Sequence, residues 1–221
     1  MSRVAIVGAH GKVAQQLMRV LYDDGDDFVG LVRAEEHAED VYRLGGEGVV
    51  LDIEQADPDA IAAAIAGCDA VVFTAGAGAG SGVERKRTVD YAGSVKSAQA
   101  AARAGIRRFV QVSAWGVDSP VEADADPQWR AYVEAKRDAD AELRSSGLDW
   151  TILRPGRLTF DEGTGEVLIA DSVPRGDIPR EDVARLIAAC LADPGTIGRT
   201  WEVVSGDTPI DEAIRALTRA S

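Results

Sequence analysis

The sequence predicts an α/β fold in which a doubly wound parallel sheet is covered by helices on both faces. Short apolar runs alternate with helix-period segments along most of the chain, and the first run is apolar at four successive positions, 4–7. A strand without polar positions is buried on both faces, as strands of parallel sheets are. A glycine-containing turn follows this run at once and leads into a helix-period segment. Alternation of strands and helices favours parallel pairing.

Length and composition favour one domain, 1–221, with a sizeable core. The chain has 221 residues, of which 46% are hydrophobic, and that size is usual for a single domain. It lacks both the run of roughly 18 apolar residues that spans a membrane and the regions of a signal peptide. We therefore expect a cytoplasmic protein with no membrane partner. Cys68 and Cys190 lie in apolar helix-like segments, which predicts core thiols instead of a disulfide or a metal site.

The charge of the chain is strongly negative. Its 37 acidic residues outnumber 24 basic ones, for a formal net charge of −13, which argues against binding to nucleic acid. The lysines are few: Lys12, Lys86, Lys96 and Lys136. An acidic surface with so little lysine suits a salt-rich cytoplasm, so we hypothesise a halophilic habitat.

The turn after the first strand has the features of a phosphate-binding loop. Gly8 ends the strand, Gly11 follows three residues later, and Ala14 lies three further on in the helix-period segment. Glycines let the backbone approach phosphates, and a helix N-terminus offers unpaired N–H groups and the positive end of its dipole. This order predicts a dinucleotide site. The spacing departs from Gly-x-Gly-x-x-Gly, and an ordinary tight turn is the alternative.

The end of the second expected strand, Phe28–Val32, bears on the choice of cofactor. Arg33 stands where NAD-specific folds place an acidic residue for the ribose 2′-hydroxyl. A planar guanidinium suits a 2′-phosphate instead. The sequence therefore predicts NADP in preference to NAD, with an incidental surface arginine as the alternative. His10 and His37 are too far apart in sequence to suggest a metal site.

Further strands and helices continue the alternation. Strands are expected over 48–51, 70–74, 108–112 and 150–153, and helices over 58–66, over 83–104 as one long element, and around Tyr132 and Lys136. Asp57 and Pro58 are typical of a helix start, and Gly105 of a helix end. From about 160 to 221 the pattern predicts a strand over 166–170, a helix over 182–191, a strand over 200–204 and a helix over 209–218. We interpret this segment as a small cap on one rim.

Residues that follow the third and fourth strands are also candidates for the site. Asp52 and Ile53 would face an adenine. The small residues of the next loop would allow close approach of the backbone to a cofactor, although the loop could be only a flexible connection. The loop residues in question are Ala75, Gly76 and Ala77.

Several of these motifs together carry a family resemblance. They are Gly8–Ala14, Arg33, Ala75–Ala77, Phe109–Ser113, Tyr132-x-x-x-Lys136 and Leu153–Gly156. The chain resembles an atypical short-chain dehydrogenase/reductase of the NAD(P)-binding group related to NmrA-like proteins and sugar epimerase/dehydratases. The resemblance covers nearly the whole length and implies a Rossmann-type fold.

The resemblance implies roles for individual residues. Ser113, Tyr132 and Lys136 match the catalytic serine, tyrosine and lysine of the family. A neighbouring ammonium favours a phenolate, so Lys136 is expected to lower the pKa of Tyr132. The cofactor-binding residues that the resemblance implies, besides those already named, are Gly8, His10, Gly11, Lys12 and Val13 at the phosphate loop, Tyr132 and Lys136 themselves, and Pro155, Gly156 and Arg157 beside the nicotinamide.

Two departures from the family pattern accompany the resemblance. The helix asparagine of the family aligns with Asp90 here, and the spacing of Ser113 and Tyr132 lies between those of plain and extended members. We expect an NADP(H)-dependent oxidoreductase acting on a small carbonyl or alcohol, as a monomer or homodimer without a metal. The alternatives are a non-catalytic NADP(H)-binding redox sensor and a sugar-nucleotide epimerase or dehydratase, although the short cap leaves little to enclose a nucleotide sugar.

Overall fold

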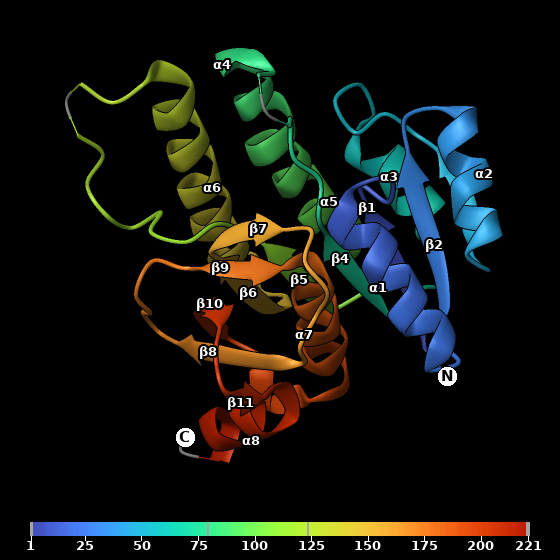
Figure 1. The fold of residues 1–221 in the computed structure, drawn as a ribbon. Coiled ribbons are helices and arrows are strands. Elements are labelled where there is room, and N and C mark those ends of the chain that lie inside the picture. Colours follow the sequence, from blue (N-terminus) through green and yellow to red (C-terminus); the bar gives the residue numbers. More distant parts are fainter. Residues whose placement is uncertain (1, 79, 123, 220–221) are drawn as a thin grey trace.

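A computed structural model describes residues 2–78, 80–122 and 124–219 (Figure 1). Its main sheet has nine strands in the order β11-β8-β10-β6-β5-β4-β1-β2-β3. The strands from β3 to β10 in that order pair in parallel, whereas β8 and β11 are antiparallel additions at one edge. Strand β1 lies between β2 and β4, and the order 3-2-1-4-5-6 is that of the Rossmann fold. The predicted fold class is confirmed.

The strands of the main sheet are β1 (Arg3–Val7), β2 (Asp27–Val32), β3 (Glu47–Val50), β4 (Ala70–Phe73), β5 (Arg108–Val112), β6 (Asp149–Pro155), β8 (Glu166–Ala170), β10 (Arg199–Ser205) and β11 (Thr208–Pro209). A separate parallel pair consists of β7 (Arg157–Thr159) and β9 (Asp177–Pro179). The helices are α1 (Lys12–Asp23), α2 (Glu35–Arg43), α3 (Pro58–Ala64), α4 (Gly82–Arg85), the π-helix η1 (Lys86–Tyr91), α5 (Ala92–Arg103), α6 (Pro127–Ser145), α7 (Arg180–Ala192), the 3₁₀ turn η2 (Pro194–Thr196) and α8 (Ile210–Arg219).

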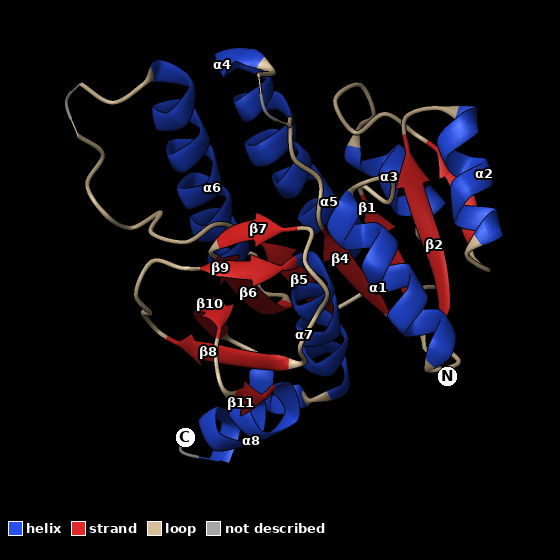
Figure 2. Ribbon diagram, viewed as in Figure 1, coloured by secondary structure: helices blue, strands red, loops and turns tan. Residues whose placement is uncertain are grey.

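Helices cover the sheet on both faces (Figure 2), and two apolar cores lie between the helices and the sheet. Val4 and Ile6 of β1 belong to the core under α1, α2, α7 and α8. Ala5 and Val7, the alternate residues, belong to the core under α3, α5 and α6. Successive strand residues point to opposite faces, so the uninterrupted apolar run at 4–7 follows from burial on both sides.

Helix ends largely follow the expected chemistry. The Asp57 carboxylate accepts a hydrogen bond from the N–H of Ala60 at 2.8 Å, and Pro58 begins α3. Gly105 has φ +75° just after α5, a left-handed conformation that glycine adopts at little cost. The helix α2, outside the expected elements, buries just Ala38 and Val41; this apolar stripe is too narrow to stand out in sequence.

The single long helix expected over 83–104 is wrong in detail. The segment consists of α4, the π-helix η1 and α5. The wider π turn lets Lys86 and Asp90 bond the backbone of the loop after β4. In α5, Ala98 and Ala101 meanwhile remain in the core. The segment therefore contacts the loop after β4 through η1 and the core through α5.

The C-terminal third extends the sheet as well as covering a rim. Strand β10 pairs in parallel with β6, and β8 and β11 continue beyond it. The β7–β9 pair lies between α6 and α1 in Figure 1. In the described part of the chain, no helix is long and apolar enough to cross a bilayer. Cys68 and Cys190 are free, buried thiols, and burial raises the pKa of Cys190 to about 12.

Candidate functional site

A cavity of about 800 Å³ lies at the carboxyl ends of the parallel strands. Its volume is usual for a small-molecule or cofactor site. It lies beside β1 and β4, where the strand order of the sheet reverses, and this is the usual ligand position in such sheets. The loops that follow β1, β2, β3, β4 and β5 all contribute residues to its lining. The predicted residues that line it are Gly8, His10, Gly11, Lys12, Val13, Arg33, Asp52, Ile53, Ala75, Gly76, Ala77, Ser113, Tyr132 and Lys136.

The turn between β1 and α1 lines the cavity and leads directly into the N-terminus of a helix. Gly8 has φ +87°, and a Cβ there would lie 2.7 Å from the Cα of Ala75, so glycine is needed for the close approach of the loops after β1 and β4. Gly11 caps α1 without a side-chain hydrogen bond, and the first turn of α1 has no acidic residue. The N–H groups of Gly8, Ala9 and Gly11 bond backbone carbonyls. Those of the first turn of α1 are available to a phosphate, so the helix N-terminus fits a dinucleotide diphosphate.

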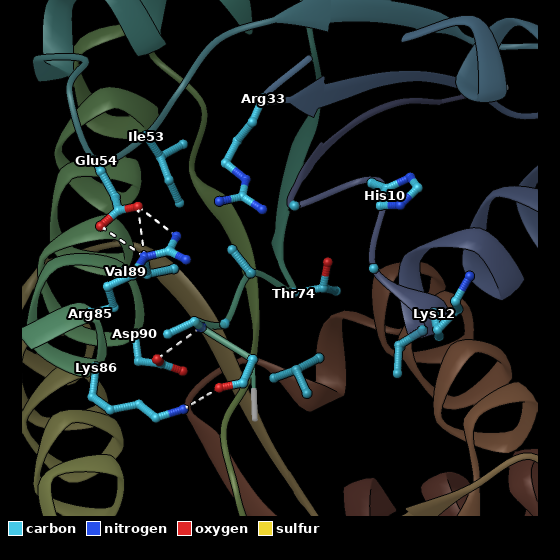
Figure 3. Close-up of a pocket in the computed structure, with 18 of the residues that line it drawn as sticks. His10, Lys12, Arg33, Ile53, Glu54, Thr74, Arg85, Lys86, Val89 and Asp90 are labelled. Carbon is cyan, nitrogen blue, oxygen red and sulfur yellow. Dashed lines mark hydrogen bonds and ion pairs between the residues drawn. The ribbon is translucent and has the colours of Figure 1, made fainter. Parts of the chain in front are cut away.

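An unpaired guanidinium occupies the outer end of the cavity. Arg33 is exposed, and among the described residues its side chain has no hydrogen-bond or ion-pair partner. Figure 3 shows it between His10 and Glu54. The Glu54 carboxylate is already occupied, because it accepts hydrogen bonds from Arg85 Nη2 and Thr88 Oγ1, both at 2.6 Å. The bond from Arg85 is the main cause of the lowered pKa of Glu54, so this carboxylate remains ionised.

His10 and His37 meet beside this guanidinium, although they are far apart in sequence. Their rings stack with centroids 3.5 Å apart, and His10 Nδ1 lies 3.7 Å from Asp40 Oδ2. Burial and then His37 lower the pKa of His10, so the two imidazoles resist carrying charge together. Within the described residues, no three His, Cys, Asp or Glu side chains gather as a metal site would need.

The inner end of the cavity contains a buried hydrogen-bond network around Ser113. Its hydroxyl donates to Asp140 Oδ2 at 2.9 Å. Asp140 is fully buried and also accepts from Gln111 Nε2 at 2.7 Å and Arg154 Nε at 2.9 Å. Burial raises the pKa of Asp140, and Arg154 opposes this shift. Arg154 in turn donates to Asp118 at 2.6 Å, so the proton of Ser113 points into a closed network.

The ammonium of Lys136 is also already partnered. Its Nζ donates to the carbonyl of Val112 at 3.1 Å and lies 3.5 Å from Asp90 Oδ1. Both side chains are buried. The other oxygen of Asp90 accepts the N–H of Ala77 at 3.0 Å, an interaction drawn in Figure 3. Asp90 therefore joins Lys136 to the loop after β4.

Tyr132 differs from the sequence expectation in its acidity. Burial is the main influence and raises the pKa of Tyr132, with smaller contributions in the same direction from Asp90 and Asp140. Lys136 lowers this pKa as expected, but its effect is smaller. Lys86 Nζ also lies 5.3 Å from the centroid of the tyrosine ring while donating to the carbonyl of Gly78 at 2.7 Å. The phenol therefore remains protonated at neutral pH.

Pro155, Gly156 and Arg157, which the family resemblance places beside the nicotinamide, are not among the residues that line the cavity. Strand β6 continues through Pro155, and the N–H of Gly156 bonds the carbonyl of Val203. The exposed Arg157 pairs with Asp177 across the β7–β9 pair. The lining residues that the sequence reasoning missed include Glu54, Arg85, Lys86, Trp129, Leu158 and Arg180. Asp140 was open to detection, because it lies one helical turn after Lys136.

Comparisons with known proteins agree with this geometry. A family model described as NAD(P)H-binding matches residues 8–194. A Bacillus subtilis protein named as an uncharacterized sugar epimerase, YhfK, is 40% identical over 97% of this chain and 100% of its own. A solved structure of a putative NAD-dependent epimerase/dehydratase from Bacillus halodurans is 39% identical, with a TM-score of 0.90 over 98% of this chain and 100% of that one. The oxidoreductase ylbE from Lactococcus lactis is 29% identical, with a TM-score of 0.87 over 98% and 97%.

Proposed function

The chain belongs to the NAD(P)H-binding family, and from that premise we propose that it is an NADP(H)-dependent reductase acting on a small carbonyl compound. One observation supports this most strongly. A single cavity joins the phosphate-type turn at Gly8 and Gly11 to Tyr132 and Lys136. Names of similar proteins include both oxidoreductase and epimerase, and both kinds of activity use a nicotinamide cofactor.

The residues of the outer end support NADP(H) over NAD(H). The N–H groups at the start of α1 would hold the diphosphate, and Arg33 would bind the 2′-phosphate. Asp52 and Ile53 line the same part of the cavity and would contact the adenosine. The nearby carboxylate of Glu54 is engaged by Arg85, so it competes little with a phosphate for Arg33.

The inner end has the groups for proton transfer. A bound NADPH supplies the hydride for reduction of a carbonyl. Tyr132, held protonated by its surroundings, donates a proton to the carbonyl oxygen as charge develops there. Ser113 already donates its proton to Asp140, so Tyr132 is the proton donor that we assign. Lys136 orients the site and would contact the cofactor ribose.

The test is cofactor binding followed by turnover. Dissociation constants of NADPH and NADH would be measured calorimetrically, and NADPH consumption would then be followed on a panel of quinones, aldehydes and ketones. We expect tighter binding of NADPH than NADH and turnover of at least one carbonyl class. Equal affinities would remove the assignment of NADP(H). Epimerisation of UDP-glucose without net cofactor consumption would replace the reductase by an epimerase.

A second candidate, an NADP(H)-binding protein without turnover, is favoured by one observation. Asp90 lies 3.5 Å from Lys136 and balances the charge that would activate the tyrosine. A protein that binds NADPH tightly and reduces nothing on the panel would support this candidate. Measurable turnover that depends on the Tyr132 hydroxyl would exclude it.

A further inference from the structure

We infer that Arg180 makes one wall of the cavity a binding site for an anionic group, and that the substrate is an aromatic carbonyl compound carrying such a group. This inference rests on the proposed function and adds the class of substrate. Arg180 begins α7, directly after β9, and lines the same cavity as Tyr132.

The first support is the unsatisfied state of the Arg180 guanidinium. Its Nη1 is buried and has no hydrogen-bond partner among the described residues. Arg3 and Arg108 also bury an unpartnered nitrogen, but each bonds acceptors through its other nitrogens. No described residue accepts a hydrogen bond from Arg180. Because Arg180 lines the cavity and its N–H groups have no acceptor among the described residues, the guanidinium is available to an anion on a ligand.

A second unsatisfied donor lies at the end of the neighbouring strand. Thr159 Oγ1 is buried without a partner in the described structure. Thr159 pairs in register with Pro179, the residue before Arg180. Thr159 lies outside the cavity lining, so its hydroxyl is not a second contact for a ligand in the cavity. The Arg180 guanidinium is therefore the proposed partner of the anion, because its N–H groups can bind both oxygens of a carboxylate.

The apolar surroundings indicate the body of the ligand. The Arg180 guanidinium lies 4.0 Å from the centroid of the Phe160 ring, which is 81% exposed. Trp129, which is 52% exposed, and Leu158 line the cavity itself. Stacking on Phe160 covers one face of the guanidinium and leaves its N–H edge for an anion. Exposed aromatic rings around a cavity favour an aromatic ligand.

The proposed anion has two chemical sources, a carboxylate on the aromatic compound and the phosphate of a nucleotide sugar. The exposed apolar rings favour the first. Matched probes separate them: para-carboxybenzaldehyde, the neutral para-methylbenzaldehyde, and UDP-glucose. Benzoate and neutral benzamide serve as non-reacting ligands, with binding followed by NMR in the presence and absence of NADPH.

We expect wild type to reduce para-carboxybenzaldehyde with a kcat/KM at least about tenfold above that of para-methylbenzaldehyde. Arg180→Met should lower this ratio by about tenfold to a hundredfold, as expected for a lost charge-assisted bond. It should also abolish the preference for benzoate over benzamide. Arg185→Met is the control, because Arg185 lies on the same helix and pairs with Glu181 outside the cavity lining.

Other outcomes would overturn the inference in distinguishable ways. A matching loss of NADPH affinity in Arg180→Met would assign the arginine to the cofactor diphosphate. Arg180-dependent binding of UDP-glucose without any preference for benzoate would assign the site to a nucleotide sugar. Failure of wild type to bind NADPH would overturn the proposed function, whereas benzoate binding without NADPH would still test Arg180 itself. If Arg180→Met does not fold, Phe160→Ser should weaken benzoate binding; unchanged binding there would contradict the assigned wall.

Discussion

The two ends of the cavity use charge in opposite ways. At the outer end Arg33 is exposed and, within the described chain, unpaired. At the inner end Lys136 and Asp140 are buried, and each already bonds protein groups. An exposed, unpaired charge is available to a ligand, whereas buried partnered charges hold geometry, because breaking them leaves an uncompensated charge in the interior. Binding selectivity should therefore depend on the outer end and chemistry on the inner end.

The largest effect expected is on turnover, from the loss of one inner hydroxyl. Tyr132→Phe removes the proposed proton donor and little else, so it should lower kcat by about 10²–10⁴, the usual contribution of a positioned acid. NADPH affinity should stay within a few-fold. Steady-state kinetics on whichever carbonyl wild type reduces, with calorimetric NADPH binding, measure both. Turnover equal to wild type would remove Tyr132 from the mechanism.

The outer end should respond in affinity instead. Arg33→Ala removes a proposed bond to the 2′-phosphate worth about 1.5–3 kcal/mol, so NADPH should bind about tenfold to a hundredfold more weakly. NADH affinity should change little. The control is Arg43→Ala, which removes an exposed arginine of α2 that pairs with Asp40 and Glu39. Equal losses for both cofactors would show that Arg33 does not select between them.

The charge of Asp90 allows a sharper test of the inner end. Asp90, Asp140 and burial all raise the pKa of Tyr132, while Lys136 lowers it. Asp90→Asn keeps the shape and removes one charge, so this pKa should fall. Reduction needs the protonated phenol, and so the alkaline loss of activity should move to lower pH.

Ultraviolet titration against Tyr132→Phe gives the same pKa without turnover. Lys136→Met should shift the pKa of Tyr132 upward. A fall in Lys136→Met, or no shift in Asp90→Asn, would contradict the balance of charges described for this end.

Salt should produce the smallest effect, and it should act on exposed charges. With a net charge of −13, the surface repels itself most at low ionic strength. Raising KCl from low to molar concentration should increase Tm by about 2–4 °C, near 1 kcal/mol for a chain of this size. Calorimetry with sucrose as an uncharged control would separate screening from general exclusion. A flat Tm would remove the halophile hypothesis.

Local sequence patterns predicted which residues line the cavity better than they predicted which groups those residues contact. Gly8, Gly11 and Arg33 could be predicted from the sequence, because their roles follow from their positions in the turns directly after strands. Ser113 and Tyr132 also line the cavity as expected. The acidity of Tyr132 was not predictable from the Lys136 spacing, because burial and Asp90 from a distant helix oppose the ammonium.

The missed features depend on pairings across the fold. Glu54 lies in the loop after β3 and Arg85 ends α4, and their side chains meet at 2.6 Å. Arg157 is held away from the cavity by Asp177, which belongs to a strand of three residues without a sequence signal. The position of Arg180 was also missed because of this short strand, since β9 places the start of α7 at the rim of the cavity.

The π-helix η1 has a consequence for how this site can change. One residue more per turn rotates everything before it by about 100° relative to an uninterrupted α-helix. An uninterrupted α-helix through the same sequence would therefore turn Arg85, at the end of α4, away from its present direction. The π-helix thus sets the orientation of α4 relative to α5. Residues at the cavity end of this helix can therefore face the cavity while α5 remains packed against α3 and the sheet.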